Sequence, residues 1–220
     1  MLVSFPLFGK ESILNCKIEN NKVISQNICF GFIKISKDFT YEGEFYNGRI
    51  NGKGIFVWLN KNIFNDYVGD FKNDRLHGKG KLTWVNGDVY IGSFFLGKIE
   101  GYGKKIFKNG NIYEGQFKDG VFNGIGKYID TANNIYEGGF KEGNFEGLGQ
   151  IIYKSGDTYK GNWKDGKRHG LGILRSKNNE TSYNGEWKNG LPDGIGTIIY
   201  KNGTKQKTEF LKGKINKKLN

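Results

Sequence analysis

The fold of this chain is decided by a stretch that recurs along it, Tyr113-Glu114-Gly115-Gln116-Phe117-Lys118-Asp119-Gly120-Val121-Phe122-Asn123-Gly124-Ile125-Gly126. In each copy a Tyr is followed by Gly two residues later, then by a small polar or acidic residue, Phe or Trp, and finally Gly-x-Gly. The lead tyrosines are Tyr41, Tyr67, Tyr90, Tyr113, Tyr136, Tyr159 and Tyr183. They lie 23 residues apart except for intervals of 26 after Tyr41 and 24 after Tyr159. A fixed period of this length indicates a repeat protein.

Repeat positions are numbered here from the lead tyrosine, which is position 1. Two degenerate copies flank the seven clear ones. In the first, Ile18 stands where the tyrosine would be, and in the last, Gln206 and Thr208 replace the Tyr of position 1 and the Gly of position 3. Worn ends are expected because a terminal repeat has no neighbour and must cap the stack. We therefore divide the chain into an N-terminal extension or capping strand (1–17), a degenerate repeat (18–40), seven repeats (41–205) and a degenerate C-terminal cap with a basic tail (206–220).

Apolar residues recur at every second position, as they do in β-strands, both within Tyr113–Phe117 and after Gly-x-Gly, as in Gly196–Tyr200. Each repeat is therefore predicted to be a β-hairpin whose loop covers positions 8 to 12, such as Gly120–Gly124. Turn residues such as Asn109-Gly110 link one hairpin to the next. No stretch has helical periodicity. The prediction is an all-β fold: an elongated, single-layer, twisted array of tandem antiparallel β-hairpins.

Glycine is frequent, with 35 in 220 residues, and most glycines hold fixed places in the repeat. Glycine in a strand costs backbone entropy, so its recurrence needs a physical reason. We expect the glycine two residues after each tyrosine to leave a flat patch on which the ring of a neighbouring hairpin lies.

These residues resemble the MORN-repeat family, whose pattern is Tyr-x-Gly-[Glu/Asp/Gln/Asn]-[Phe/Trp]-x-x-Gly-x-x-x-Gly-x-Gly. The resemblance is close from Tyr41 to about Lys205. The departures are local: Asp74 stands where the family has Gly, Gly139 takes the polar place, and Asp130 and Ser176 replace second-strand aromatics.

The resemblance implies one of two kinds of protein. MORN arrays occur beside catalytic domains, such as lipid kinases and lysine methyltransferases, and as free-standing scaffolds in junctional membrane complexes, flagella and protist cortical skeletons. Here the repeats occupy almost all of the 220 residues, which leaves no segment of the roughly 100 residues that a catalytic domain needs. We expect a non-catalytic scaffold of the second kind without a cofactor.

Three weaker motifs do not indicate a nucleotide, metal or catalytic site. Gly92–Lys98 and Gly161–Lys167 match the start of a phosphate-binding loop, but Ile99 and Arg168 follow where that loop has Ser or Thr. The two histidines, His77 and His169, share position 11 four repeats apart, so we interpret them as exposed loop residues rather than a metal or catalytic pair. With no signal peptide and no other cysteines, Cys16 and Cys29 favour a reduced pair over a disulfide.

Charge is the other functional clue. The formal net charge is +12, and the last twenty residues hold seven lysines against Glu209. Such a surface attracts anionic membranes, although lysines also protect sheets from aggregation. The candidates for a membrane-facing surface are Lys164, Lys167, Arg168, Lys205, Lys207, Lys212, Lys214, Lys217 and Lys218.

The favoured function is the binding of an extended or amphipathic protein segment along a groove of the array, at a membrane-associated or cytoskeletal structure in the cytoplasm. Alternation places positions 1, 3 and 5 on one face. The candidate groove residues are Tyr41, Phe45, Tyr67, Phe71, Tyr90, Phe94, Tyr113, Phe117, Tyr136, Phe140, Tyr159, Trp163, Tyr183 and Trp187. Direct binding of anionic phospholipid is the alternative, pairing of two arrays stays open, and nucleic acid is disfavoured because no recognition helix is expected.

Overall fold

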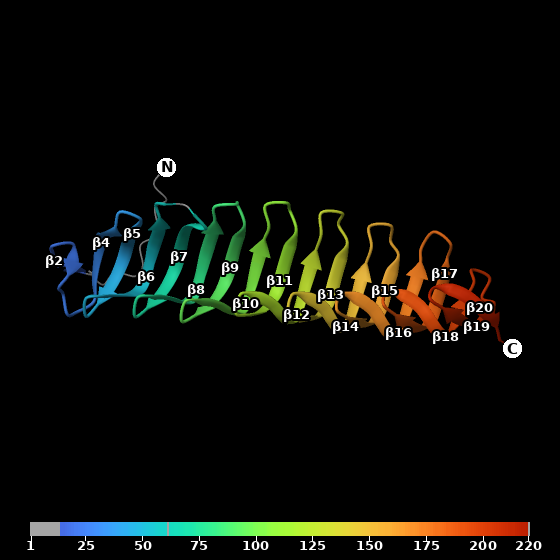
Figure 1. The fold of residues 1–220 in the computed structure, drawn as a ribbon. Helices are drawn as coiled ribbons and strands as arrows, with labels where there is room; N and C mark the ends of the chain where they lie inside the picture. The colour runs from blue at the N-terminus through green and yellow to red at the C-terminus, as the bar shows by residue number, and fades with distance from the viewer. Residues whose placement is uncertain (1–13, 61, 220) are drawn as a thin grey trace. The chain divides into compact units, whose positions relative to one another are not determined.

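The computed structural model describes residues 14–60 and 62–219 and shows a succession of β-hairpins (Figure 1). The chain divides into two units: unit 1 runs to Asn86 and includes Phe94–Gly97, and unit 2 comprises Gly87–Ser93 and everything from Lys98 onward. The described residues form strands and turns but no helix, and so no helix that could cross a membrane. The prediction of an all-β hairpin array is confirmed.

Unit 1 contains strands β1 to β8. β4 to β8 pair with one another in order and antiparallel, β1 pairs parallel with β4, and β2 and β3 form a separate small sheet. The strands are β1 (Leu14–Asn15), β2 (Ile18–Glu19), β3 (Lys22–Val23), β4 (Cys29–Ser36), β5 (Phe39–Tyr46), β6 (Arg49–Trp58), β7 (Phe64–Lys72) and β8 (Arg75–Trp84). The worn N-terminal repeat thus supplies only its second strand, β4, to the sheet of hairpins.

Unit 2 contains β10 to β20, which pair in order and antiparallel; β9 (Val89–Phe95) contributes residues to both units. The strands are β10 (Lys98–Ile106), β11 (Ile112–Lys118), β12 (Val121–Ile129), β13 (Ile135–Lys141), β14 (Asn144–Ile152), β15 (Thr158–Lys164), β16 (Lys167–Ser176), β17 (Thr181–Lys188), β18 (Leu191–Ile199), β19 (Lys205–Leu211) and β20 (Lys214–Lys218).

The hairpin loop is shorter than the sequence predicted. Only positions 7 and 8 form the turn, and position 9 already belongs to the second strand, as Val121 does in β12. Both turn residues are left-handed, with φ of 49° at Asp119 and 81° at Gly120. This is the two-residue turn whose twist matches that of the strands. The predicted loop of positions 8 to 12 was therefore wrong, because the later glycines lie inside a strand.

Those later glycines form a bulge. Position 3 pairs with position 14 and position 5 with position 10, so one residue faces three on the second strand, as between Gly115 and Phe117. The glycine at position 12 has positive φ, 79° at Gly124. The polar side chain at position 4 holds the bulge: Gln116 Oε1 accepts a hydrogen bond from the Ile125 amide at 2.8 Å. The small polar residue of the motif is thus a structural part of the hairpin.

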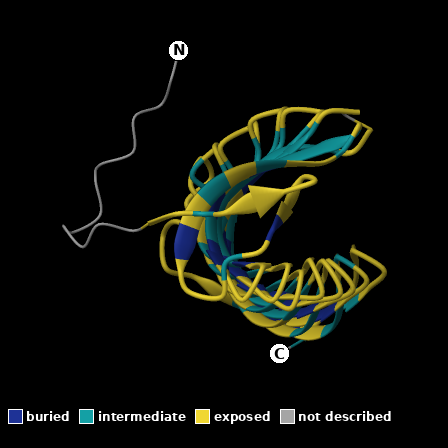
Figure 2. Cartoon of the chain, turned by 90° about the vertical axis from the view of Figure 1, so that its left-hand side faces the viewer, coloured by how far each residue is buried: buried dark blue, intermediate teal, exposed yellow. Residues whose placement is uncertain are grey.

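The bulge lets the strands bend, as Figure 2 shows. We call the face that carries positions 1, 3 and 5 the inner face of each unit, and the opposite face the outer face. The bend brings position 10 over the lead tyrosine, so that the rings of Tyr113 and Phe122 stack at 3.7 Å and those of Tyr136 and Phe145 at 3.6 Å.

The repeated glycines accommodate a tyrosine of their own hairpin. Gly115 and Gly126 face each other across the strands, and a methyl group on Gly126 would lie 2.6 Å from Tyr113 Oη. The same arrangement recurs at Gly161 and Gly172 with Tyr159. A steric reason was predicted correctly for the glycines, but the ring belongs to the same hairpin, because the side chain at position 1 points forward along its own strand, toward positions 3 and 4.

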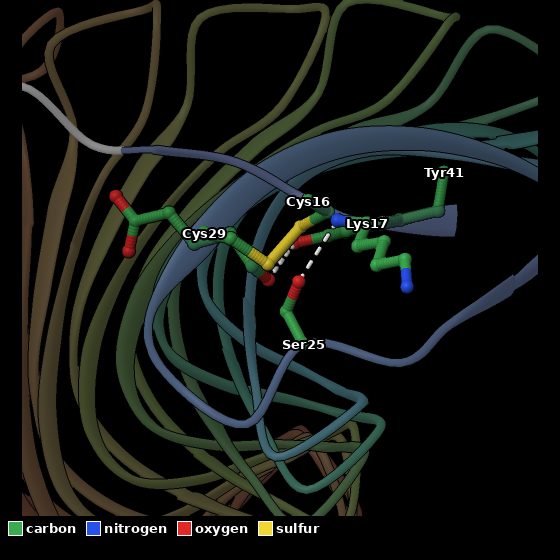
Figure 3. The surroundings of a disulfide bond; sticks show 6 residues. Cys16, Lys17, Ser25, Cys29 and Tyr41 are labelled. Atoms are coloured by element: carbon green, nitrogen blue, oxygen red, sulfur yellow. Dashed lines mark hydrogen bonds between the residues drawn. A yellow bond between two sulfur atoms is a disulfide. The ribbon is translucent and has the colours of Figure 1, made fainter. Parts of the chain in front are cut away.

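The ends of the array are capped differently. Cys16 and Cys29 form a disulfide that ties the segment after β1 to β4 (Figure 3), so the reduced pair favoured by the sequence was wrong. The amide of Cys16 also donates to the Phe30 carbonyl at 2.9 Å. At the C-terminus β19 and β20 form a hairpin in which Thr208 replaces the position 3 glycine and is fully buried. Residues 1–13, most of the predicted extension, lie outside the described residues.

Candidate functional site

The predicted groove residues are the core of the array. All fourteen aromatic side chains at positions 1 and 5 are buried, with 0 to 7% exposed. From the second clear repeat onward, each position 5 ring meets the tyrosine of the preceding repeat edge to face, for example Phe117 with Tyr90 at 5.0 Å and Phe140 with Tyr113 at 4.9 Å. Edge-to-face contacts of this kind stabilise aromatic cores. The shared face was predicted correctly, but these side chains are not open to a partner.

The tyrosine hydroxyls are satisfied inside the hairpin. In each of the seven repeats the position 1 hydroxyl donates to the backbone carbonyl of position 4, as from Tyr159 to Asn162 at 2.9 Å. Burial raises the pKa of Tyr159 to about 12, because the low dielectric of the core disfavours the phenolate. These hydroxyls therefore serve the fold.

A second layer of aromatic rings lies above this core on the inner face of unit 1. Five half-buried rings from β5 to β8 form what we call the unit 1 strip. Consecutive centroids lie 5.8, 4.6, 5.2 and 5.9 Å apart. The strip consists of Phe39, Phe56, Trp58, Phe64 and Trp84. Its rings are partly open to solvent and can contact another molecule.

Unit 2 has an open hollow of about 230 Å³ on its inner face. Phe122, Tyr128 and Phe145 contribute rings to its lining, and Gly143 and Gly166 leave room at the hairpin tips. In the same hairpin as Phe122, position 18 carries Asp130 in place of an aromatic ring, and Asp130 Oδ1 accepts hydrogen bonds from the amides of Ala132 and Asn134 in the following turn.

The sequence predicted the groove at positions 1 and 5 but not the half-exposed rings, which lie at positions 10, 16 and 18 and, for Phe39 and Phe64, just before a lead tyrosine. A signal was available, because Trp58 and Trp84 occupy position 18 and Phe122 and Phe145 occupy position 10. Alternation alone could not predict which of these aromatic layers is buried and which is exposed, because all of them lie on the same face of the sheet. The bend of the hairpin decides which layer is covered.

The predicted basic residues divide between the two faces. Lys164, Lys205, Lys207 and Lys214 are exposed and alternate with inward-facing neighbours, as Lys164 does with Trp163. Lys167 pairs with Lys164 and Lys217 with Glu209, which places both on the outer face, whereas Lys212 lies in a turn. Lys218 pairs with the buried Thr208, on the inner side.

Arg168 does not belong to a basic surface. Its guanidinium lies 4.2 Å from the ring centroid of Trp187 and donates to the Gly190 carbonyl at 2.8 Å. It takes the place that Phe122 and Phe145 hold in other repeats, so its membrane-facing assignment was wrong. A cation over an aromatic face replaces a stacked ring there.

The other motif residues have structural places. His77 and His169 lie in β8 and β16 and are half-buried, so the prediction of exposed loop residues was wrong. Residues 14–60 and 62–219 contain no group of three or more His, Cys, Asp or Glu that could hold a metal. Gly161 faces Gly172, and Gly166 forms a hairpin turn, so Gly161–Lys167 is a hairpin and does not cradle a phosphate.

The MORN repeat matches seven consecutive segments of the sequence, at residues 41–63, 67–89, 90–112, 113–134, 136–158, 159–181 and 183–205. The chain belongs to the MORN-repeat family. MORN repeats are interaction modules for proteins and membranes and are not themselves enzymes.

Solved structures are similar only in part. The TCP domain of SAS-4 from Drosophila melanogaster, in complex with a proline-rich motif of Ana2, is 15% identical, with 65% of this chain and 84% of that chain covered and a TM-score of 0.36. The TCP10c domain of Drosophila melanogaster Sas-4 is 16% identical, with 65% and 93% covered and a TM-score of 0.34. No significant match is found among the curated proteins.

Proposed function

We propose that this MORN-repeat protein is a non-catalytic scaffold that binds a segment of a partner protein on its inner face. The observation that supports this is the unit 1 strip, in which Phe56, Trp58, Phe64 and Trp84 form a continuous half-exposed row of rings. These rings are additional to the fully buried core, since Tyr41 and Tyr67 already fill it.

The chemistry of the strip favours a peptide with apolar anchor residues. Tryptophan is enriched among the residues that contribute most to protein interfaces. Aromatic rings offer a large contact area and lose little conformational entropy when a partner orders them. A scaffold of this kind would act at a membrane-associated or cytoskeletal structure, where free-standing arrays of the family occur.

The test is a peptide selected from a display library on the immobilised wild-type protein, with binding to every variant followed by the fluorescence anisotropy of a dye on the peptide and binding to the wild type also followed by tryptophan fluorescence. Trp163 and Trp187 are 6% and 2% exposed, so a change on binding reports Trp58 and Trp84. We expect Trp58→Ser with Trp84→Ser to weaken binding about 100-fold.

Leu59→Ser is the matched control, because Leu59 follows Trp58 and is 46% exposed. It should bind the peptide as the wild type does. If the serine variant unfolds, Trp58→Phe with Trp84→Phe takes its place in the test. This variant keeps the packing of the rings and should retain part of the affinity. Selected peptides that bind both double variants with wild-type affinity would place the partner elsewhere.

A further inference from the structure

The outer face of unit 2 carries a row of exposed aliphatic side chains that the hairpin does not need. Leu148, Leu171 and Ile195 are 73%, 64% and 47% exposed and all occupy position 13. Their cross-strand partners in the next repeat are at position 4, as Glu186 is for Leu171. Because position 4 alternates with the inward positions 3 and 5, these side chains lie on the outer face.

The hairpin uses only the backbone at position 13. The Ile195 amide donates to Glu186 Oε1 at 3.0 Å, and that bond closes the bulge whatever side chain stands there. In unit 1 the same position is occupied by Lys53 and Lys79. Ile125 holds the same position one repeat before Leu148, so four consecutive repeats carry an exposed aliphatic residue there, which calls for a reason outside the hairpin.

Cationic side chains flank this row on both sides. Lys160 lies two residues before, and Lys164 two residues after, the partner of Leu148, so both share its face. Lys188 and Lys207 stand likewise beside the partners of Leu171 and Ile195. The exposed cations of this face over β15 to β20 are Lys160, Lys164, Lys167, Arg175, Lys188, Lys205, Lys207, Lys214 and Lys217.

The positive charge of this surface is not neutralised by ion pairs with acidic residues of the same chain. Among the described parts of the chain, none of these nine cations forms an ion pair. The acidic residues facing the row, Glu186 and Glu209, already accept hydrogen bonds from the Ile195 amide and Asn216 Nδ2. We call the nine cations with the three aliphatic residues the outer basic surface.

We propose that the outer basic surface binds an acidic amphipathic helix of a partner protein, independently of the inner face. Successive aliphatic side chains are two strands apart, about 9.6 Å. Residues seven apart on an α-helix are about 10.5 Å apart, so a helix lying across the strands presents an apolar residue to each. Acidic residues on both flanks of the apolar stripe then meet the lysines on both sides of the row.

Two other occupants fit less well. A second copy of the chain would bring the same lysines against one another, which like charges disfavour. A bilayer recruits tryptophan and tyrosine as interfacial anchors, but in these hairpins Trp163, Trp187 and Tyr183 are buried on the inner face. Acidic protein segments satisfy both the charge and the spacing.

The test uses a synthetic helical peptide of about three heptads with leucine along one stripe and glutamate on both flanks. Binding to the wild-type protein is measured by fluorescence anisotropy at rising salt. We expect Leu148→Ser with Leu171→Ser to weaken binding at least about tenfold, because two buried aliphatic contacts are lost. Lys164→Gln with Lys188→Gln should weaken it about tenfold at low salt and less at high salt.

Val85→Ser is the matched control. It changes an aliphatic residue, 45% exposed, that lies in unit 1 and outside the outer basic surface, and it should leave binding unchanged. All variants change exposed residues and should melt as the wild type does. A peptide with lysine in place of glutamate should not bind.

Vesicles containing phosphatidylserine are assayed in parallel. Binding of the acidic peptide that depends on Leu148 and Leu171 supports the proposal. If instead only vesicles bind and the same variants release them, the surface is a membrane contact and the proposal is wrong. The proposal is also overturned if neither the acidic peptide nor the vesicles bind, or if the peptide binds the aliphatic and lysine variants as well as it binds the wild type.

Discussion

Gly126→Ala tests the packing of each tyrosine on the glycine pair of its own hairpin. The added methyl group would lie 2.6 Å from Oη, 2.7 Å from Cε2 and 2.8 Å from Cζ of Tyr113. Carbon atoms in contact need about 3.5 Å, so the ring must move by roughly 1 Å. It cannot do so freely, because the Phe117 and Phe140 rings contact it at 5.0 and 4.9 Å.

The magnitude follows from these contacts. Overpacking costs about 1 to 3 kcal/mol, and complete loss of a buried aromatic side chain about 3 to 5 kcal/mol. Because Tyr113 is fully buried between two rings, we expect Gly126→Ala to lower the free energy of unfolding by about 3 kcal/mol. Urea unfolding followed by circular dichroism measures it.

A double-mutant cycle isolates the cause. Tyr113→Ala removes the ring, so Gly126→Ala should cost little more in that background, and the coupling should be about 2 kcal/mol or larger. Ile125→Ala, at a neighbouring residue that is 67% exposed, should change stability by less than about 0.5 kcal/mol. Additive effects of Gly126→Ala and Tyr113→Ala would refute the packing argument.

Alkaline pH should unfold the array. Burial raises the pKa of Tyr159 to about 12, so the stability that the buried, neutral phenol contributes is complete below pH about 10 and is lost as the pH rises toward 12. Tyrosinate absorbance should therefore rise together with loss of β-sheet signal, and ionisation without unfolding would contradict this. Arg168→Ala should lower the free energy of unfolding by about 1 to 3 kcal/mol, since it removes a ring contact and a hydrogen bond. The control Lys167→Ala, at the adjacent exposed residue, should melt as the wild type does. If both variants had the same effect on stability, Arg168 would not be part of the packed inner face. Cys16→Ser with Cys29→Ser removes a disulfide of sequence separation 13 and should lower the free energy of unfolding by about 3 kcal/mol. Hydrogen exchange of backbone amides should become faster only near β4. Unchanged exchange near β4 would count against a capping role for the disulfide.

The sequence by itself determined the hairpin array and its family, because these depend on local spacing. The 23-residue period, the alternation within Tyr113–Phe117 and the turn glycines each act over a few residues and need no distant partner. Alternation also determined that positions 1, 3 and 5 share a face.

Tertiary structure alone decided which of the residues on that face are accessible. The bulge bends each hairpin until Phe122 lies on Tyr113, which converts the predicted groove residues into core and leaves the rings at positions 10, 16 and 18 half-exposed on the inner face. The ring over each glycine pair, the role of Arg168 as a substitute for an aromatic ring and the Cys16–Cys29 disulfide depend in the same way on packing between strands. Local patterns set which face a side chain is on, but only the bend sets how deeply it is covered.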